Sequence, residues 1–274
     1  MISRRFLLIF LSVISFLVCA FGIVPASANP LRLHMLDVGY ADAIIIEAPD
    51  GSTMMIDAGT GESSPKIIDY LHQHGIETVD HAVITHPHQN HFGGFLALTA
   101  RIPVRHFYVN GDERAEDGYG DLLENIEVNR IPLSVLKKGD TLKVRGMQVT
   151  ALHPDSFDAN VNASSLVLYV VYKDIKILLA ADIEPAQQDS LLAEYPFLKE
   201  AQLVKIPHHG GPLSENFIRL MQDKIFLVST GTNPWGLPLE EQLQQLQGTV
   251  YRTDKQGNIV VETDGYHIMV KYDQ

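Results

Sequence analysis

Three imidazole side chains stand within six residues of this chain, directly after a short apolar strand. The segment is His86-Pro87-His88-Gln89-Asn90-His91, and it follows the run 80–85. Residues two apart on an extended chain point the same way, so His86 and His88 share one side, and His91 then opens a predicted helix. Imidazole is a common ligand of zinc, iron and manganese. The pattern predicts a metal site at the end of a strand, and it requires a fold that brings further ligands there.

Two more predicted strands end in residues of ligand type. Asp182 follows the apolar strand 175–180, and His208-His209 follow the strand 203–206. If these strands lie side by side, all three groups meet at one edge, as ligand sites in α/β proteins do. A polar surface loop of stacked histidines is the alternative, but it leaves the two downstream strand ends unexplained.

Strands and helices alternate along the chain in two halves, without a linker or repeat. Periodicity and turn residues predict strands over 31–36, 43–48, 54–56, 80–85, 104–109, 142–152, 165–172, 175–180, 203–206, 225–229, 259–263 and 267–272. They predict helices over 64–74, 91–100, 185–192, 214–221 and 239–247, with 112–121 a loop or exposed helix start. This indicates one α/β domain with two sheets at its core and helices outside.

Composition excludes several classes of protein. The 274 residues carry 33 Asp and Glu against 21 Lys and Arg, a formal charge of −12 that argues against a broad basic DNA-binding surface. The single cysteine, Cys19, excludes a disulfide framework and a Cys-x-x-Cys zinc site. The chain also lacks the glycine-rich nucleotide loops and the GxSxG serine elbow.

Residues 1–28 resemble a secretory signal peptide. Arg4 and Arg5 precede the uncharged run 6–24, and Ala26-Ser27-Ala28 offers the small residues that a signal peptidase needs. A retained N-terminal membrane anchor is the alternative. Either places the domain 29–274 outside the cytoplasm, secreted or held at the cell surface. Removal of the two arginines would change the formal charge from −12 to −14.

The histidine segment is similar to the HxHxDH signature of the metallo-β-lactamase superfamily. Further segments, in order, resemble one branch of it, the exported hydrolase domain of the competence protein ComEC. They are LDVGYADA at 36–43, MIDAG at 55–59, THPHQNHFGG at 85–94, NASSLVL at 162–168, LLAAD at 178–182, IPHHGG at 206–211 and YRTDKQG at 251–257. The resemblance implies an αββα sandwich with a metal site at one edge of the two sheets.

The resemblance also implies roles for individual residues around Zn²⁺ or Mn²⁺, as one or two ions. His86 and His88 would hold a first ion, Asn90 and His91 a second, and Asp182 would bridge them. The resemblance leaves open which of two adjacent residues completes the second position, His208 or His209.

Four further polar residues are expected near the metal site, and three of them could instead be turn residues. Asn162 either orients the substrate or the attacking water, or is a turn residue. Asp57 is expected to accept a hydrogen bond from the histidine loop and so to hold a ligand in place. Asp37 and Asp42 either support the site or form turns.

The departures from the family pattern fall at motif positions. Asn90 stands where the family has Asp, and a neutral amide is a weaker ligand that should hold a second dication less firmly. Tyr40 and Ala41 replace Gln and Gly, and Gly211 replaces Ser. Two hypotheses follow: a hydrolase with one metal or a shifted substrate, or a catalytically weakened binding protein.

The reaction that the resemblance implies is hydrolysis by a metal-activated hydroxide. Asp182 or a supporting carboxylate would orient the water, and phosphodiesters or other phosphoesters, DNA among them, are the expected substrates. The acidic charge disfavours DNA and makes a small phosphoester as plausible. Lys137-Lys138, Lys143 and Arg145 form the only compact basic stretch.

Overall fold

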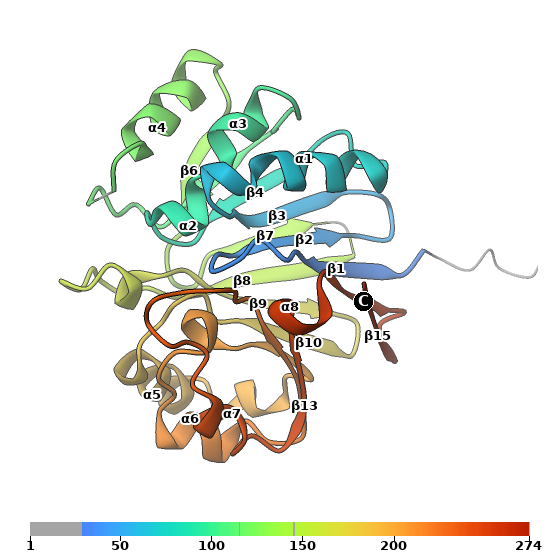
Figure 1. Ribbon diagram of the computed structural model, residues 1–274, viewed down its shortest axis with the longest axis vertical. Coiled ribbons are helices and arrows are strands. Elements are labelled where there is room, and N and C mark those ends of the chain that lie inside the picture. The colour runs from blue at the N-terminus through green and yellow to red at the C-terminus, as the bar shows by residue number, and fades with distance from the viewer. Residues whose placement is uncertain (1–28, 115, 145, 274) are drawn as a thin grey trace, which may run out of the picture.

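The computed structural model describes residues 29–114, 116–144 and 146–273. The predicted signal peptide or anchor, 1–28, lies outside the described residues. Two sheets lie face to face in the middle of the molecule, with helices on the outer face of each (Figure 1). The predicted αββα sandwich is therefore confirmed.

The first sheet has the strand order β15-β14-β1-β2-β3-β4-β5-β6. Strands β3 to β6 are parallel to one another, and the remaining neighbours are antiparallel. The bounds are β1 Leu31–Met35, β2 Ala43–Glu47, β3 Thr53–Ala58, β4 His81–Ile84, β5 Phe107–Val109, β6 Leu133–Val135, β14 Ile259–Thr263 and β15 Ile268–Tyr272.

The second sheet has the order β13-β12-β11-β10-β9-β8-β7. Strands β10 to β13 are parallel, whereas β7 to β10 form an antiparallel meander. The bounds are β7 Thr141–Val144, β8 Met147–His153, β9 Val167–Tyr172, β10 Ile175–Leu179, β11 Leu203–Lys205, β12 Lys224–Val228 and β13 Gly248–Arg252.

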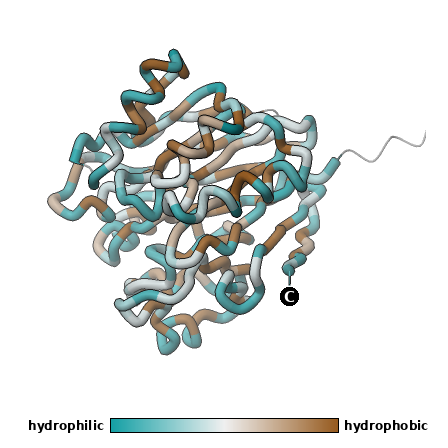
Figure 2. Tube along the Cα trace, turned by 45° about the horizontal axis from the view of Figure 1, so that its top comes forward, coloured by the Kyte–Doolittle hydropathy of each residue, from teal (hydrophilic) through white to brown (hydrophobic). Residues whose placement is uncertain are grey.

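Helices cover each outer face. Over the first sheet lie α1 Ser64–Gln73, α2 Gln89–Phe92, α3 Phe95–Thr99 and α4 Tyr119–Val128; over the second lie α5 Pro185–Glu194, α6 Glu215–Leu220 and α7 Glu240–Leu243, while α8 is Thr253–Gln256. One apolar core fills the space between the sheets, and each helical layer packs on a core of its own. Apolar stretches accordingly follow the strands, and polar stretches follow the loops (Figure 2). Among the described residues, none of the helices combines the length and apolarity needed to span a bilayer.

The structure differs from the predicted elements at several points. The predicted helix 91–100 is divided at Gly93-Gly94 into α2 and α3, and a Cβ on Gly94 would lie 1.9 Å from the Ala58 carbonyl oxygen. The predicted strand 142–152 is two strands, β7 and β8. The stretch 112–121, predicted as a loop or exposed helix start, contains the start of α4 at Tyr119, whereas β6 and β13 were missed.

A histidine that is buried between the first sheet and helix α1 should make the fold acid-sensitive. His34 on β1 is buried beneath α1, with Nδ1 2.9 Å from the Tyr70 hydroxyl. Burial, together with the charge of His74, lowers the pKa of His34 from 6.5 to about 4. The folded state therefore prefers neutral His34. The contribution of this preference to the free energy of unfolding is complete above pH 6.5 and is lost as the pH falls towards 4.

We expect the protonation of His34 to lower the free energy of unfolding by on the order of 3 kcal/mol between pH 7 and pH 4. Urea melts of the wild type and of His34→Leu at pH 7 and pH 4.5 measure the effect. The variant should lose less stability between the two pH values, whereas the exposed control His72→Leu should match the wild type. Equal acid sensitivity of His34→Leu and wild type would contradict the assignment.

Candidate metal centre

The ligand-type residues meet at the carboxyl ends of parallel strands from both sheets. Asp57 stands at the end of β3, and His86 and His91 follow β4. From the second sheet, Asp182 follows β10 and His209 follows β11. Because parallel strands end at a common edge, the sheet topology alone brings these residues together.

Three buried histidines have the same orientation, with Nδ1 bound to a protein acceptor and Nε2 facing the site. His91 Nδ1 donates to Asp57 at 2.8 Å, and His209 Nδ1 donates to the Ser229 carbonyl at 2.9 Å. His86 Nδ1 lies 3.1 Å from the Thr85 hydroxyl, which itself donates to Asp57 at 2.8 Å. Such partners fix the tautomer and direct the Nε2 lone pair, as they do in metal sites.

The distances between the facing atoms fit ligands of a common cation. His86 Nε2 and His88 Nδ1 are 3.0 Å apart, and Asp182 Oδ2 lies 3.2 Å from His91 Nε2 and 3.4 Å from His209 Nε2. Two ligands of tetrahedral Zn²⁺ at about 2.0–2.1 Å from the ion are separated by roughly 3.3 Å. Candidate ligand atoms converge in the sets His86–His91–Asp182 and Asp42–Asp182–His209. The donor set therefore fits one or two metal ions.

A buried lysine, which the sequence analysis did not identify, compensates two carboxylates of the site. Lys205 Nζ lies 2.5 Å from Asp42 and 3.4 Å from Asp182, and it donates to the Ala181 carbonyl at 2.8 Å. Lys205, Asp42 and Asp182 are almost fully buried. The signal in the sequence was a lone lysine in the apolar strand before His208-His209.

The electrostatics of the centre favour a negative Asp182 and a neutral His86. Burial opposes the charge of Asp182, but His209, His91 and Lys205 outweigh it and hold the pKa of Asp182 well below its usual range. Burial, with the nearby charge of His91, keeps the pKa of His86 well below 6.5. Burial would lower the pKa of His91 as well, but the carboxylates of Asp182 and Asp57 raise it to about 10.

Asn90 presents its amide nitrogen to the site. Asn90 Nδ2 donates to His209 Nε2 at 3.0 Å and lies 3.5 Å from the Tyr40 carbonyl oxygen. An amide binds cations through its oxygen, so ligation by Asn90 requires the amide to turn and the bond to His209 to break. The second ligand set is thus weaker at this position than a carboxylate would make it.

The two adjacent histidines have different surroundings. His209 is fully buried and faces Asp182, whereas His208 is only partly buried and is 4.0 Å from the same carboxylate. His208 Nδ1 faces Glu184 at 3.4 Å, and its Nε2 accepts from Asn162 Nδ2 at 3.3 Å. Glu184 outweighs burial and raises the pKa of His208. The geometry favours His209 as the ligand and His208 as a cavity residue.

A cavity of about 660 Å³ opens onto this centre. It is lined by Tyr40, Thr60, His88, Gln89, Asn90, Glu116, Asn162, Asp182, His208, Trp235 and Leu237. Asn162 Oδ1 has no hydrogen-bond partner among the described residues, which leaves it able to accept from a bound molecule. Of the supporting carboxylates, Asp42 and Asp57 join the network, while Asp37 contacts Lys66 and Asn258 and remains outside it.

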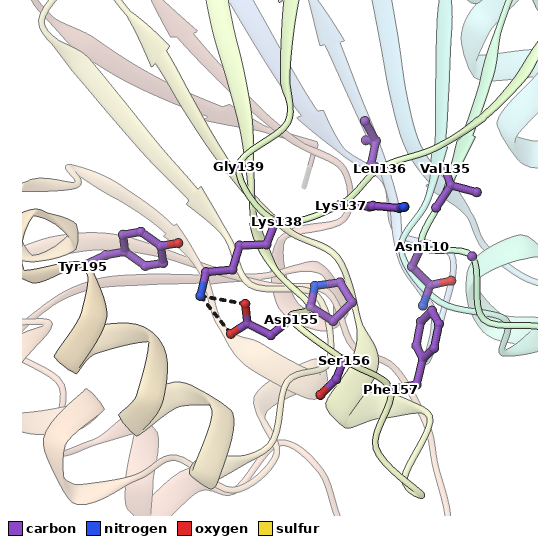
Figure 3. Close-up of a pocket in the computed structure, with 12 residues that line it drawn as sticks. Asn110, Val135, Leu136, Lys137, Lys138, Gly139, Asp155, Ser156, Phe157 and Tyr195 are labelled. Carbon is purple, nitrogen blue, oxygen red and sulfur yellow. Dashed lines mark hydrogen bonds and ion pairs between the residues drawn. The ribbon is translucent and has the colours of Figure 1, made fainter.

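A second cavity, of about 790 Å³, shares no lining residue with the cavity at the metal centre and lies beside β6 and the end of β8 (Figure 3). Lys138 enters it, and its ammonium group contacts Asp155 at 2.7 Å and Glu194 at 2.6 Å. Two acidic partners neutralise this lysine, so part of the predicted basic stretch is unavailable to a polyanion.

Comparison with known proteins agrees with this geometry. ComE operon protein 3 of Bacillus subtilis (strain 168) is 27% identical over 261 residues, 86% of this chain and 34% of that protein. The uncharacterized protein YcaI of Escherichia coli (strain K12) is 28% identical over 228 residues, 79% of this chain and 28% of that protein. The chain thus spans roughly a third of the length of these relatives. The first of them confirms the predicted resemblance to a competence protein.

The fold is likewise that of a solved structure, the metallo-beta-lactamase fold protein YhfI from Bacillus subtilis. The TM-score is 0.58 at 10% identity, over 86% of this chain and 100% of that one. The family model of the metallo-beta-lactamase superfamily matches residues 36–231, most of the described chain. With the sandwich, the strand-end histidines and this match in agreement, the chain belongs to the metallo-β-lactamase superfamily.

Proposed function

We propose that this chain is a metal-dependent hydrolase of phosphoesters that acts outside the cytoplasm. The observation that carries the proposal is the buried convergence of His86, His91 and Asp182 beside an open cavity. A merely structural metal site would be closed by protein ligands, whereas a catalytic one keeps access to a substrate. The export component rests on the sequence of residues 1–28.

One divalent ion, Zn²⁺ or Mn²⁺, would be held by Asp182 and by imidazoles of His86, His88 and His91. Such an ion supplies an activated water and a Lewis acid for the developing negative charge. The protein's own part is to fix the ligands: Asp57 and Thr85 orient His91 and His86 through their Nδ1 atoms. Asn162 and His208 line the cavity, where the unpartnered Asn162 Oδ1 can accept a hydrogen bond from the substrate.

The formal charge of the centre supports one tightly held ion rather than two. A histidine must be neutral to bind a metal, so His91 gives up its proton in the loaded centre. Asp42, Asp57 and Asp182 then contribute three negative charges, and Lys205 contributes one positive charge. The remainder of two negative charges balances a single dication. With two dications and a neutral Asn90, the buried centre would carry excess positive charge, which burial disfavours.

The alternative function is a binding protein that has lost hydrolysis. The bond between Asn90 and His209 favours it, because this contact occupies a ligand atom of the second position. We nevertheless prefer the hydrolase, because the donors His86, His91 and Asp182 converge without any contribution from Asn90. A small phosphoester is the preferred substrate class, since the acidic chain and the neutralised Lys138 offer little attraction to long DNA.

We expect the purified chain to hydrolyse bis(p-nitrophenyl) phosphate with Mn²⁺ or Zn²⁺, and EDTA to abolish the activity. His86→Ala removes one buried ligand and should lower kcat/KM by about 100-fold or more. The exposed control His267→Ala should remain within about twofold of the wild type, by the same principle. An EDTA-resistant activity, or equal rates in both variants, would overturn the metal assignment.

We expect Asn90→Asp to create a second firm metal position. Elemental analysis after reconstitution and desalting should give about one ion per chain for the wild type and about two for Asn90→Asp, because the added carboxylate supplies charge and a better ligand. Asn129→Asp adds the same charge on the surface and should stay near one ion.

The activities of the same proteins decide between the two functions. A silent wild type whose Asn90→Asp variant gains hydrolysis would exclude the hydrolase and favour the binding protein. A wild type that already holds two ions would instead refute the charge argument and leave the hydrolase intact.

A further inference from the structure

Two aromatic side chains form one wall of the cavity at the metal centre. Tyr40 lies in the turn after β1 and Trp235 in the loop after β12, with ring centroids 4.8 Å apart. The Tyr40 ring also packs on His209, at a centroid distance of 4.4 Å. Trp235 is 66% exposed. The indole of Trp235 is thus exposed to solvent, and only the Tyr40 ring separates it from the candidate ligand His209.

The loop that carries Trp235 is held by a single amide side chain. Asn233 Nδ2 donates to the carbonyls of Gly231 and Leu237, and its Oδ1 accepts from the backbone N–H groups of Trp235 and Leu237. The exposed indole is therefore presented by an ordered loop, and it loses little conformational entropy on binding a ligand.

Close contact between two backbones brings the aromatic rings together. A Cβ on Gly231 would lie 2.6 Å from the Gly39 Cα, so only glycine allows this approach of the two turns. The Ser229 hydroxyl donates to the Ala41 carbonyl at 2.6 Å and fastens the same turns. The placement of Tyr40 beside Trp235 is thus fixed by the fold rather than by the rings themselves.

We propose that Tyr40 and Trp235 form a stacking subsite for the planar ring of a nucleoside phosphoester. This inference rests on the proposed function and names its substrate class. Stacking of a base on an aromatic side chain strengthens binding by roughly ten- to hundred-fold. With the ring on this wall, an ester group on the same molecule reaches into the cavity that Asp182 and His208 line.

The remaining walls match a single nucleoside better than a long strand. The cavity volume of about 660 Å³ lies in the range of sites for small molecules. Glu116 and the unpartnered Asn162 Oδ1 are acceptors for the N–H groups of a base. A long polyanion would instead meet the carboxylate of Glu116 and a chain of formal charge −12.

The test uses the only tryptophan of the chain, Trp235, as its reporter. Adenosine 5′-monophosphate and ribose 5-phosphate carry the same phosphate ester and differ in the base. With the Zn²⁺-loaded protein, we expect the nucleotide to quench the tryptophan fluorescence and, by calorimetry, to bind about tenfold or more tightly than the sugar phosphate. Equal affinities, or binding of the nucleotide without quenching, would overturn the subsite.

Variants separate stacking from a structural effect. Tyr40→Gln should weaken nucleotide binding by about tenfold or more and leave ribose 5-phosphate binding unchanged. Tyr266→Ala removes an exposed ring from the turn between β14 and β15, away from the cavity, and should change the affinity for neither ligand. If Tyr40→Gln weakens both ligands alike, Tyr40 is a structural residue and the proposal fails.

The two proposals fail differently. Hydrolysis of bis(p-nitrophenyl) phosphate together with equal binding of both ligands would overturn the stacking subsite alone. Absence of hydrolysis, with tighter binding of the nucleotide and quenching, would overturn the hydrolase and support the subsite.

Discussion

The arrangement of this centre depends on the burial of three carboxylates at the meeting edge of two sheets. Only 1% of the surface of each of these residues, Asp42, Asp57 and Asp182, is exposed. A buried charge must be matched by hydrogen-bond donors or by cations. The protein matches Asp57 with Thr85 and His91, and it matches Asp42 and Asp182 with Lys205. These partners come from different strands, so the carboxylates join the two halves of the fold and leave Asp182 Oδ2 free to face the imidazoles.

The sequence was sufficient to predict that these candidate ligands come together, because most of them follow apolar strands and parallel strands share an edge. It was not sufficient for Lys205, since a lone lysine in a short strand is usually a surface residue. Nor did it distinguish His208 from His209. Only the three-dimensional structure shows that His209 Nδ1 meets the Ser229 carbonyl while His208 turns to Glu184.

The incorrect predictions of secondary structure have a related cause. The apolar pattern of 91–100 suits one helix, but Gly94 packs so closely on Ala58 that the chain bends there and α3 begins afresh. His91 lies in α2, just before this bend, with Nδ1 2.8 Å from Asp57, so the break in the helix adjoins a candidate ligand. Contact between distant backbones, as at Gly94 and Gly231, leaves no periodic signal in a sequence.

The departures from the family pattern at positions 40 and 90 are neighbours in space. Asn90 lies 3.5 Å from the Tyr40 carbonyl oxygen and 3.0 Å from His209, on which the Tyr40 ring packs. One change removes a charge from the second metal position, and the other adds an aromatic ring at the adjoining wall. Both residues contact His209, so the two departures meet at one side chain. Under the proposed function, this side of the cavity would hold a cation less firmly and present a flat apolar surface to the substrate instead.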